Sequence, residues 1–97
     1  MSTALQTLTR TRAKEPAMWA VVIHNDDFTP FEFVIKVLSE VFHKTADEAA
    51  IIAGTVHENG KTRLSPFTKE VAQDKVYRVT KLAEHAGHPL LLTAEEA

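Results

Sequence analysis

The chain has 97 residues, which is enough for one domain with a single hydrophobic core. Its formal charge of -2 argues against nucleic-acid binding, because its 11 Lys and Arg side chains are scattered among 13 Asp and Glu side chains. It contains no cysteine, which excludes disulfides, thiolate zinc sites and a cysteine nucleophile and fits a reducing cytoplasm. No apolar run approaches the roughly 18 residues of a membrane span. We therefore expect a cytoplasmic domain with neither a nucleic-acid nor a membrane partner.

Residues 1–17 are predicted to form a flexible polar tail, and residues 18–97 to form the domain. The segment "MSTALQTLTRTRAKEPA" lacks the apolar region of a secretory signal. Ser, Thr and Arg with few acidic residues also occur in organellar transit peptides, which is the less favoured alternative.

The first predicted elements are a strand over Met18–His24 and a helix that starts at Pro30. The strand segment "MWAVVIH" is apolar and rich in β-forming residues. Thr29, Pro30 and Glu32 have the spacing of a capping box, with proline at the first helical position. The helix is expected to end near His43. Its core-facing residues recur at helical spacing and are Phe33, Val34, Val37, Leu38, Val41 and Phe42.

A second capping box, "TADE" at residues 45–48, predicts a helix that runs until Asn59 and Gly60. The short linker predicts that this helix forms a hairpin with the preceding one. Its core-facing residues are Ala49, Ile52, Ala53 and Val56.

The rest of the chain is predicted to form a doubtful strand, a long helix and a closing strand. "KTRLSPF" after Gly60 is doubtful because Pro66 cannot donate a ladder hydrogen bond and belongs at an edge or an end. Thr68 can cap a helix that runs to about Ala86, where Gly87 stops it. Its core-facing residues are Ala72, Val76, Val79, Leu82 and Ala83. "PLLLT", residues 89–93, is the last strand.

The order strand, helix, helix, strand, helix, strand does not alternate regularly enough for a wound parallel sheet. We therefore predict an α+β fold with a small three-stranded antiparallel sheet and three helices packed on one face.

Four consecutive polar residues, His24 to Asp27, join the first strand to the first helix. One Asn or Asp side chain is enough to close a turn, so the stretch is either a turn with surplus polarity or a binding site. Asn25, Asp26 and Asp27 offer oxygen acceptors, which suit an ammonium group. The helical hairpin can return His57 to the same place, although His57 also fits a plain helix end. The residues that would form either the core or the wall of a neighbouring pocket are Val34, Ala53 and Val56.

A metal site is the alternative chemistry for these polar residues. The candidate ligands are His24, Asp26, Asp27, His57, His85 and His88. A metal-dependent hydrolase would use the first four. The spacing of two histidines four residues apart is absent, as are a G-x-S-x-G elbow and a glycine-rich phosphate loop. We therefore expect no metal, cofactor or nucleophilic serine.

Four segments in order, "VVIHNDDFTPFEFVIKVL", "VHENGK", "FTKEVAQDKV" and "HPLLLT", resemble the ClpS adaptor family. The resemblance extends from about Trp19 to Thr93. It implies a binding module, not an enzyme, that delivers N-degron substrates to a Clp unfoldase and protease. It also implies a ClpA-like AAA+ unfoldase as partner and substrates that start with Phe, Tyr, Trp or Leu. We expect a monomer.

The resemblance assigns three sets of residues. The substrate α-amino group would be held by Asn25, Asp26, Asp27 and His57, with Thr29 nearby. The pocket for the first side chain would include Phe31, Val34, Ala53, Val56 and Leu90. The unfoldase would be bound by Phe28, Thr29, Glu70 and Lys75, and the tail would help to transfer the substrate. Family members commonly have Met at the positions of Phe31 and Ala53, which leaves the preferred N-terminal residue open.

Overall fold

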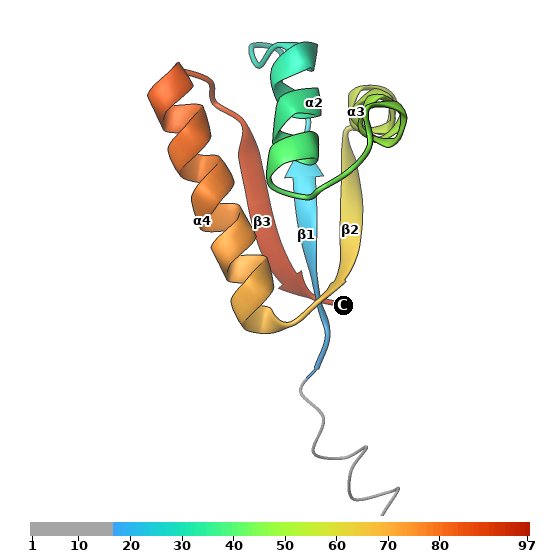
Figure 1. The fold of residues 1–97 in the computed structure, drawn as a ribbon, viewed down its shortest axis with the longest axis vertical. Coiled ribbons are helices and arrows are strands. Elements are labelled where there is room, and N and C mark those ends of the chain that lie inside the picture. Colours follow the sequence, from blue (N-terminus) through green and yellow to red (C-terminus); the bar gives the residue numbers. More distant parts are fainter. Residues whose placement is uncertain (1–16) are drawn as a thin grey trace, which may run out of the picture.

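A computed structural model describes residues 17–97 and shows the predicted order of elements (Figure 1). The elements are β1 (Trp19–His24), α2 (Phe31–Glu40), α3 (Ala46–Asn59), β2 (Lys61–Phe67), α4 (Lys69–Ala86) and β3 (Leu91–Glu96). Most of the predicted tail, residues 1–16, lies outside the described residues. The fold is α+β, as predicted.

The three strands form one antiparallel sheet with the order β2-β1-β3, so β1 is central. The doubtful segment is a strand, and it forms the edge position that Pro66 requires. Its register to β1 shifts between the pairs Trp19–Phe67 and Val21–Leu64, where the single residue Ala20 of β1 faces Ser65 and Pro66 of β2. Such a bulge is a place where a sheet tolerates proline, because the extra residue is not needed for the ladder.

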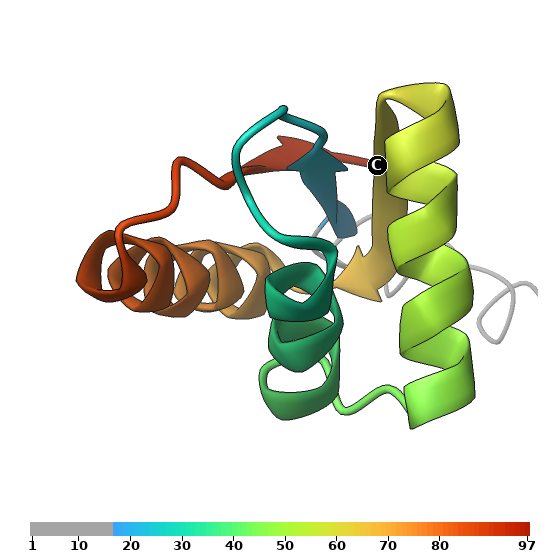
Figure 2. The same cartoon turned by 90° about the horizontal axis from the view of Figure 1, so that it is seen from above.

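All three helices cover the same face of the sheet (Figure 2). Helix α3 lies beside β2, α4 lies along β3 and β1, and α2 lies between them. The largest fully buried side chains come from both layers and are Ile23, Leu38, Val21, Val37, Val41 and Val79. Full burial of an aliphatic side chain of this size stabilises the fold by about 1.5 to 3 kcal/mol. This layer of apolar contacts fixes the ends of β1 and α3 relative to each other.

The opposite face of the sheet is covered by its own polar side chains. Arg63 of β2 and Glu95 of β3 form an ion pair of 2.9 Å that joins the two edge strands. Their partners in the central strand, Val22 and Ala20, are buried. The long side chains therefore shield the apolar residues of β1 that no helix covers.

The predicted boundaries of α3 and α4 are confirmed by their caps. Thr45 Oγ1 accepts from the backbone N–H of Glu48, and the Glu48 carboxylate accepts from the backbone N–H of Thr45. Thr68 caps α4 with its side chain. Gly60 and Gly87 have φ of 88° and 79°, a left-handed conformation that residues with a Cβ adopt at a cost.

The predicted capping box at the start of α2 is wrong. The residue at the N-cap position is Pro30, which makes no side-chain cap, and the helix begins at Phe31. The Thr29 hydroxyl donates instead to the Asp26 carboxylate at 2.7 Å. The hydroxyl thus closes the loop, and the helix begins one residue later than predicted, with Pro30 in the N-cap position.

Three other details of the prediction need correction. Helix α2 ends at Glu40, earlier than predicted, and His43 has a left-handed φ of 57°. Strand β3 covers residues 91–96 instead of 89–93, because it pairs along β1 from His24 to Trp19. Leu82, predicted in the core, is 39% exposed. The stripe of α4 that faces the sheet contains Ala72, Val79 and Ala83. Leu82 lies outside it, about 60° around the helix from Val79 and about 100° from Ala83.

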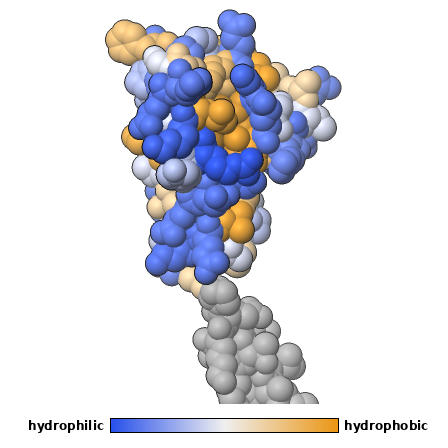
Figure 3. Space-filling model, turned by 60° about the vertical axis from the view of Figure 1, so that its left-hand side comes forward, coloured by the Kyte–Doolittle hydropathy of each residue, from blue (hydrophilic) through white to orange (hydrophobic). Residues whose placement is uncertain are grey.

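Hydropathy varies over the surface of the domain. Seen from the α4 side, apolar side chains gather in the upper part of the domain, bordered by hydrophilic ones (Figure 3).

None of the helices in residues 17–97 has the length and apolar character that a membrane crossing requires.

Candidate functional site

The loop between β1 and α2 is closed by Asp26. Its Oδ1 accepts from the backbone N–H of Phe28 at 2.8 Å and of Thr29 at 2.7 Å, and its Oδ2 accepts from Thr29 Oγ1. Asp26 is therefore the one residue of His24 to Asp27 whose side chain closes the turn. The turn leaves the Phe28 side chain 80% exposed.

The charge of Asp26 is stabilised by the same contacts. Desolvation by burial raises its pKa, but the hydrogen bonds from the Thr29 side chain, the Thr29 N–H and the Phe28 N–H outweigh this effect, and the nearby charge of His88 adds to them. The net pKa is lowered from its ordinary value of 3.8. Asp26 is therefore a carboxylate at neutral pH.

A backbone hydrogen bond joins this loop to the end of α3. The N–H of Asn25 donates to the carbonyl of Gly60 at 2.8 Å. Gly60 is the C-cap of α3, and His57 lies in the last turn of that helix. The bond therefore brings His57 beside the polar loop, as the predicted helical hairpin required.

The loop, α2 and α3 enclose a cavity of about 230 Å³. Its polar lining residues are Asn25, Asp26, Asp27, Thr29 and His57, and its apolar ones are Phe31, Val34, Ala53 and Val56. The structure thus brings together every residue predicted for the amine site and all but one predicted for the pocket. Among residues 17–97, no hydrogen bond joins the side chains of Asn25, Asp27 or His57 to another protein group.

Three of the apolar lining residues belong both to the core and to the cavity wall. Val34, Ala53 and Val56 are buried members of the hydrophobic core, and they also form the wall of the cavity. Phe31 differs from them because half of its side chain, 50%, is exposed. It stands at the opening of the cavity.

Leu90 is the predicted pocket residue that does not line this cavity. It lines a void of only about 10 Å³, which shares Asn25, Asp26, Thr29, Val34 and Val56 with the larger cavity. Leu90 is 7% exposed. It therefore packs behind the site instead of forming its open wall.

The alternative of a metal-dependent hydrolase has no ligand set in residues 17–97. No group of three or more His, Asp or Glu side chains in this part of the chain could hold a metal ion. His24 Nε2 is hydrogen-bonded to Thr93 Oγ1 at 2.9 Å, and His24 does not line the 230 Å³ cavity.

The residues predicted to bind the unfoldase do not form one cluster. Phe28 and Thr29 lie in the loop between β1 and α2, whereas Glu70 lies in the first turn of α4 at the opposite end of the domain (Figure 1). Lys75 has a structural contact that its sequence position did not reveal. Its Nζ donates to the carbonyl of Val41 at 2.6 Å, which satisfies a carbonyl at the end of α2.

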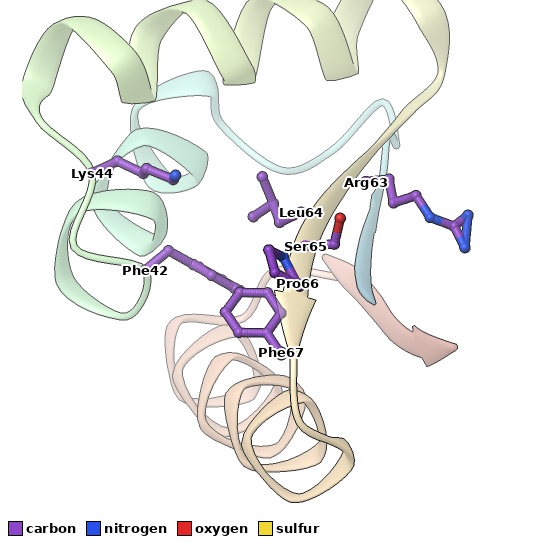
Figure 4. Close-up of a pocket in the computed structure, with 7 residues that line it drawn as sticks. All are labelled: Phe42, Lys44, Arg63, Leu64, Ser65, Pro66 and Phe67. Carbon is purple, nitrogen blue, oxygen red and sulfur yellow. The ribbon is translucent and has the colours of Figure 1, made fainter. Parts of the chain in front are cut away.

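A second cavity, of about 340 Å³, lies between the edge strand β2 and the connection from α2 to α3 (Figure 4). Its lining residues are Phe42, Lys44, Arg63, Leu64, Ser65, Pro66 and Phe67. Phe42 and Phe67 meet edge to face with a centroid distance of 6.1 Å. None of the predicted site residues lines this cavity, so it is separate from the site at the loop.

One residue beside the site was predicted only as a possible metal ligand. The ring of His88 packs against Phe33 of α2, and its charge acts on Asp26. The sequence feature that could have indicated a role for His88 is its position directly after Gly87, the residue at which α4 ends.

Comparisons with known proteins agree with the fold. The model of the family described as "ATP-dependent Clp protease adaptor protein ClpS" matches residues 14–93. The ATP-dependent Clp protease adapter protein ClpS of Deinococcus radiodurans is 44% identical over 90 residues, which cover 93% of this chain and 80% of that protein. The adapter of the same name from Nitratidesulfovibrio vulgaris is 47% identical over 83 residues, or 86% of this chain and 83% of that protein.

A solved structure is also similar. Agrobacterium tumefaciens ClpS2 bound to L-phenylalaninamide is 34% identical and has a TM-score of 0.83, with 86% of this chain and 100% of that chain covered. The matching proteins are named as adaptors and not as enzymes. The chain belongs to the ClpS family of Clp protease adaptors.

Proposed function

We propose that this chain binds the N-terminal residue of N-degron proteins in the 230 Å³ cavity and delivers these proteins to a ClpA-like AAA+ unfoldase of a Clp protease. The observation that carries the proposal is the composition of the cavity, where polar acceptors at one loop adjoin a wall of buried apolar side chains. A protein N-terminus with a bulky first residue has the same two parts, a cationic amine and an apolar side chain.

The polar part fits an α-amino group. Such a group has a reference pKa of about 7.7 to 8.0, so it is largely cationic at neutral pH, and it loses water only if acceptors replace that water. Acceptors for the amine come from two elements: Asn25 and Asp27 lie in the loop after β1, and His57 lies in the last turn of α3. Asp26 contributes mainly by its charge and by shaping the turn, because three donors of the loop already occupy it.

The apolar part fits a large first side chain. Phe31 stands at the opening, and Ala53 leaves room in the wall. The similar solved protein is bound to L-phenylalaninamide, which carries an amine and a phenylalanine side chain. Its ligand supports Phe as the N-terminal residue of a substrate. Tyr, Trp and Leu are proposed as well, because the resemblance to the family implies them.

Delivery to the unfoldase is the second part of the proposal. The family to which the chain belongs supports a Clp partner, and the exposed Phe28 gives the loop an apolar contact for it. We also propose that Glu70 contacts the unfoldase, from the other end of the domain. Lys75 is proposed to contact it too, in addition to its hydrogen bond to the carbonyl of Val41 at the end of α2. We propose that the adaptor acts as a monomer in the cytoplasm.

The test of the proposal is a titration with peptides that start with Phe and differ only in N-terminal acetylation. The free peptide is expected to bind, and the acetylated one to lose binding, because it has no cationic amine. Asn25→Ala or His57→Ala should weaken binding of the free peptide by ~1.5 to 3 kcal/mol, the scale of a charge-assisted hydrogen bond, with little change in folding. Equal affinity for both peptides would refute the proposal.

A further inference from the structure

His88 has a fixed position at the end of α4. Its backbone N–H donates to the carbonyl of Ala83 at 2.8 Å, and the N–H of Gly87 donates to the carbonyl of Glu84 at 3.2 Å. This pair of bonds is a Schellman motif, which ends a helix with a defined exit direction. The side chain of His88 is therefore presented to the neighbouring elements by the backbone, and not by a mobile loop.

The ring of His88 packs against the first turn of α2. The centroids of the His88 and Phe33 rings are 4.7 Å apart with an interplanar angle of 66°, an edge-to-face contact. Both side chains are partly buried. The backbone N–H groups of Phe33 and Val34 both donate to the carbonyl of Pro30, so Phe33 is tied directly to the residue that follows the site loop.

The same segment of chain reaches the site loop in two other ways. A positive charge on His88 would lower the pKa of Asp26, which closes the turn, so the two side chains are near each other. Two residues further on, Leu90 lines the small void that Asn25, Asp26 and Thr29 also line. The connection from α4 to β3 thus packs behind the loop, on the side away from the open cavity.

We propose that His88 is a positioning residue for the amine site: through its ring contact with Phe33 it holds the start of α2, and with it the loop that presents Asn25 and Asp27. His88 does not line the cavity, so it acts through the loop and not on the bound amine. This inference rests on the proposed function of the cavity only for its effect on peptide binding. Its effect on the loop is independent of any ligand.

The test compares His88→Gln, which removes the ring, with His88→Phe, which keeps a ring but removes its two nitrogens. His85→Gln, an exposed histidine in the last turn of α4, is the matched control. In each variant, NMR measures the exchange rates of the Phe28 and Thr29 amide protons, which are bonded to Asp26. Denaturant unfolding and affinity for the free Phe peptide are measured in parallel.

In His88→Gln these two amides should exchange about three- to tenfold faster, and peptide affinity should fall by a similar factor, as expected for the loss of an aromatic pair. His88→Phe should stay within about twofold of wild type, and His85→Gln should match wild type. Phe33→Leu, which removes the partner ring, should reproduce the effect of His88→Gln on the two amides.

Unchanged amide exchange in His88→Gln would overturn the inference, as would equal losses in His88→Gln and His88→Phe. If the two amides speed up only in proportion to a loss of global stability, His88 merely stabilises the fold and the inference is also overturned. Failure of the proposed function gives a different result, since wild type would then bind free and acetylated peptides equally while the amides still report on the loop.

Discussion

Asp26 stabilises its loop through its negative charge, and this makes the loop sensitive to acid. Its carboxylate accepts three hydrogen bonds, and the pKa of Asp26 is lowered from 3.8. A lowered pKa in the folded state means that the stabilisation is fully present above the ordinary value. As the pH falls below 3.8 and then through the lowered pKa of folded Asp26, the carboxylate is protonated and this stabilisation is lost.

Asp26→Asn isolates this charge, because an amide can still accept from the backbone and can donate to Thr29 Oγ1. The variant should be less stable than wild type by ~0.5 to 1.5 kcal/mol near neutral pH. The difference should shrink when denaturant unfolding is repeated at pH values below 3.8. Asp27→Asn, an exposed change in the same loop, is the control and should stay within about 0.5 kcal/mol of wild type. A difference for Asp26→Asn that does not vary with pH would contradict the role of the charge.

Ala53 and Phe31 should decide which side chain the cavity prefers. Ala53 forms part of the wall and is 2% exposed. A small ligand leaves space beside it, which costs about 24 cal/mol for each Å³ left empty, whereas a ring fills that space. The rigid ring of Phe31 at the opening should hinder β-branched residues.

Peptides that start with Phe, Tyr or Trp are therefore expected to bind more tightly than those that start with Leu, and Ile and Val should be rejected. Ala53→Met should partly restore Leu binding, because its flexible side chain fills the wall. Ala50→Met, on the exposed side of the same helix, should leave all affinities unchanged. Competition binding with a set of peptides measures this order. A lower affinity for Leu in Ala53→Met would show that the wall has no space to fill.

At the scale of elements, helix α3 has one glycine inside it and one at its C-cap, and the two positions place different demands on the backbone. Gly54 is inside the helix, and a Cβ added there meets nothing within 4 Å. Gly60 ends the helix with φ of 88°, and its carbonyl accepts from Asn25. Only Gly60 needs the conformational freedom of glycine.

Gly54→Ala should raise the free energy of unfolding by ~0.5 to 1 kcal/mol, because alanine favours helices. Gly60→Ala should lower it by ~1 to 2 kcal/mol, because a left-handed conformation is strained for a residue with a Cβ. Gly60→Ala should also weaken peptide binding, since it disturbs the bond that joins α3 to the site loop. Urea unfolding checks the signs, and a stabilised Gly60→Ala would mean that the helix end is not strained.

The order of elements was predictable because local signals mark most of their ends. The capping box at Thr45 and the stop at Gly87 are confirmed. The same reasoning failed at Thr29, whose hydroxyl is bonded to Asp26 in the loop while Pro30 takes the N-cap position. It also misplaced β3, whose extent depends on pairing with β1. The residues of the site were assigned largely by family resemblance. Contacts such as Lys75 with Val41 join residues 34 positions apart, and spacing alone does not indicate them.

At the scale of the whole molecule, binding and delivery should be separable. Every residue that lines the cavity lies between Asn25 and His57, so removal of residues 1–15 leaves the cavity intact. The truncated adaptor should keep its affinity for the free Phe peptide, while degradation of an N-degron protein by the unfoldase and protease should fall. Degradation assays with both forms of the adaptor check this, and an unchanged rate would show that residues 1–15 have no role in delivery.

The central place of β1 has a consequence for synthesis on the ribosome. The strand that leads into the site emerges among the first segments of the domain, but its two neighbours are residues 61–67 and 91–96. Pairing between such distant segments cannot begin until the later one has been made. A nascent chain therefore has the loop residues early but acquires their geometry only after residues 91–96 have been made. We expect a nascent chain that still lacks β3 to be unable to bind the free Phe peptide.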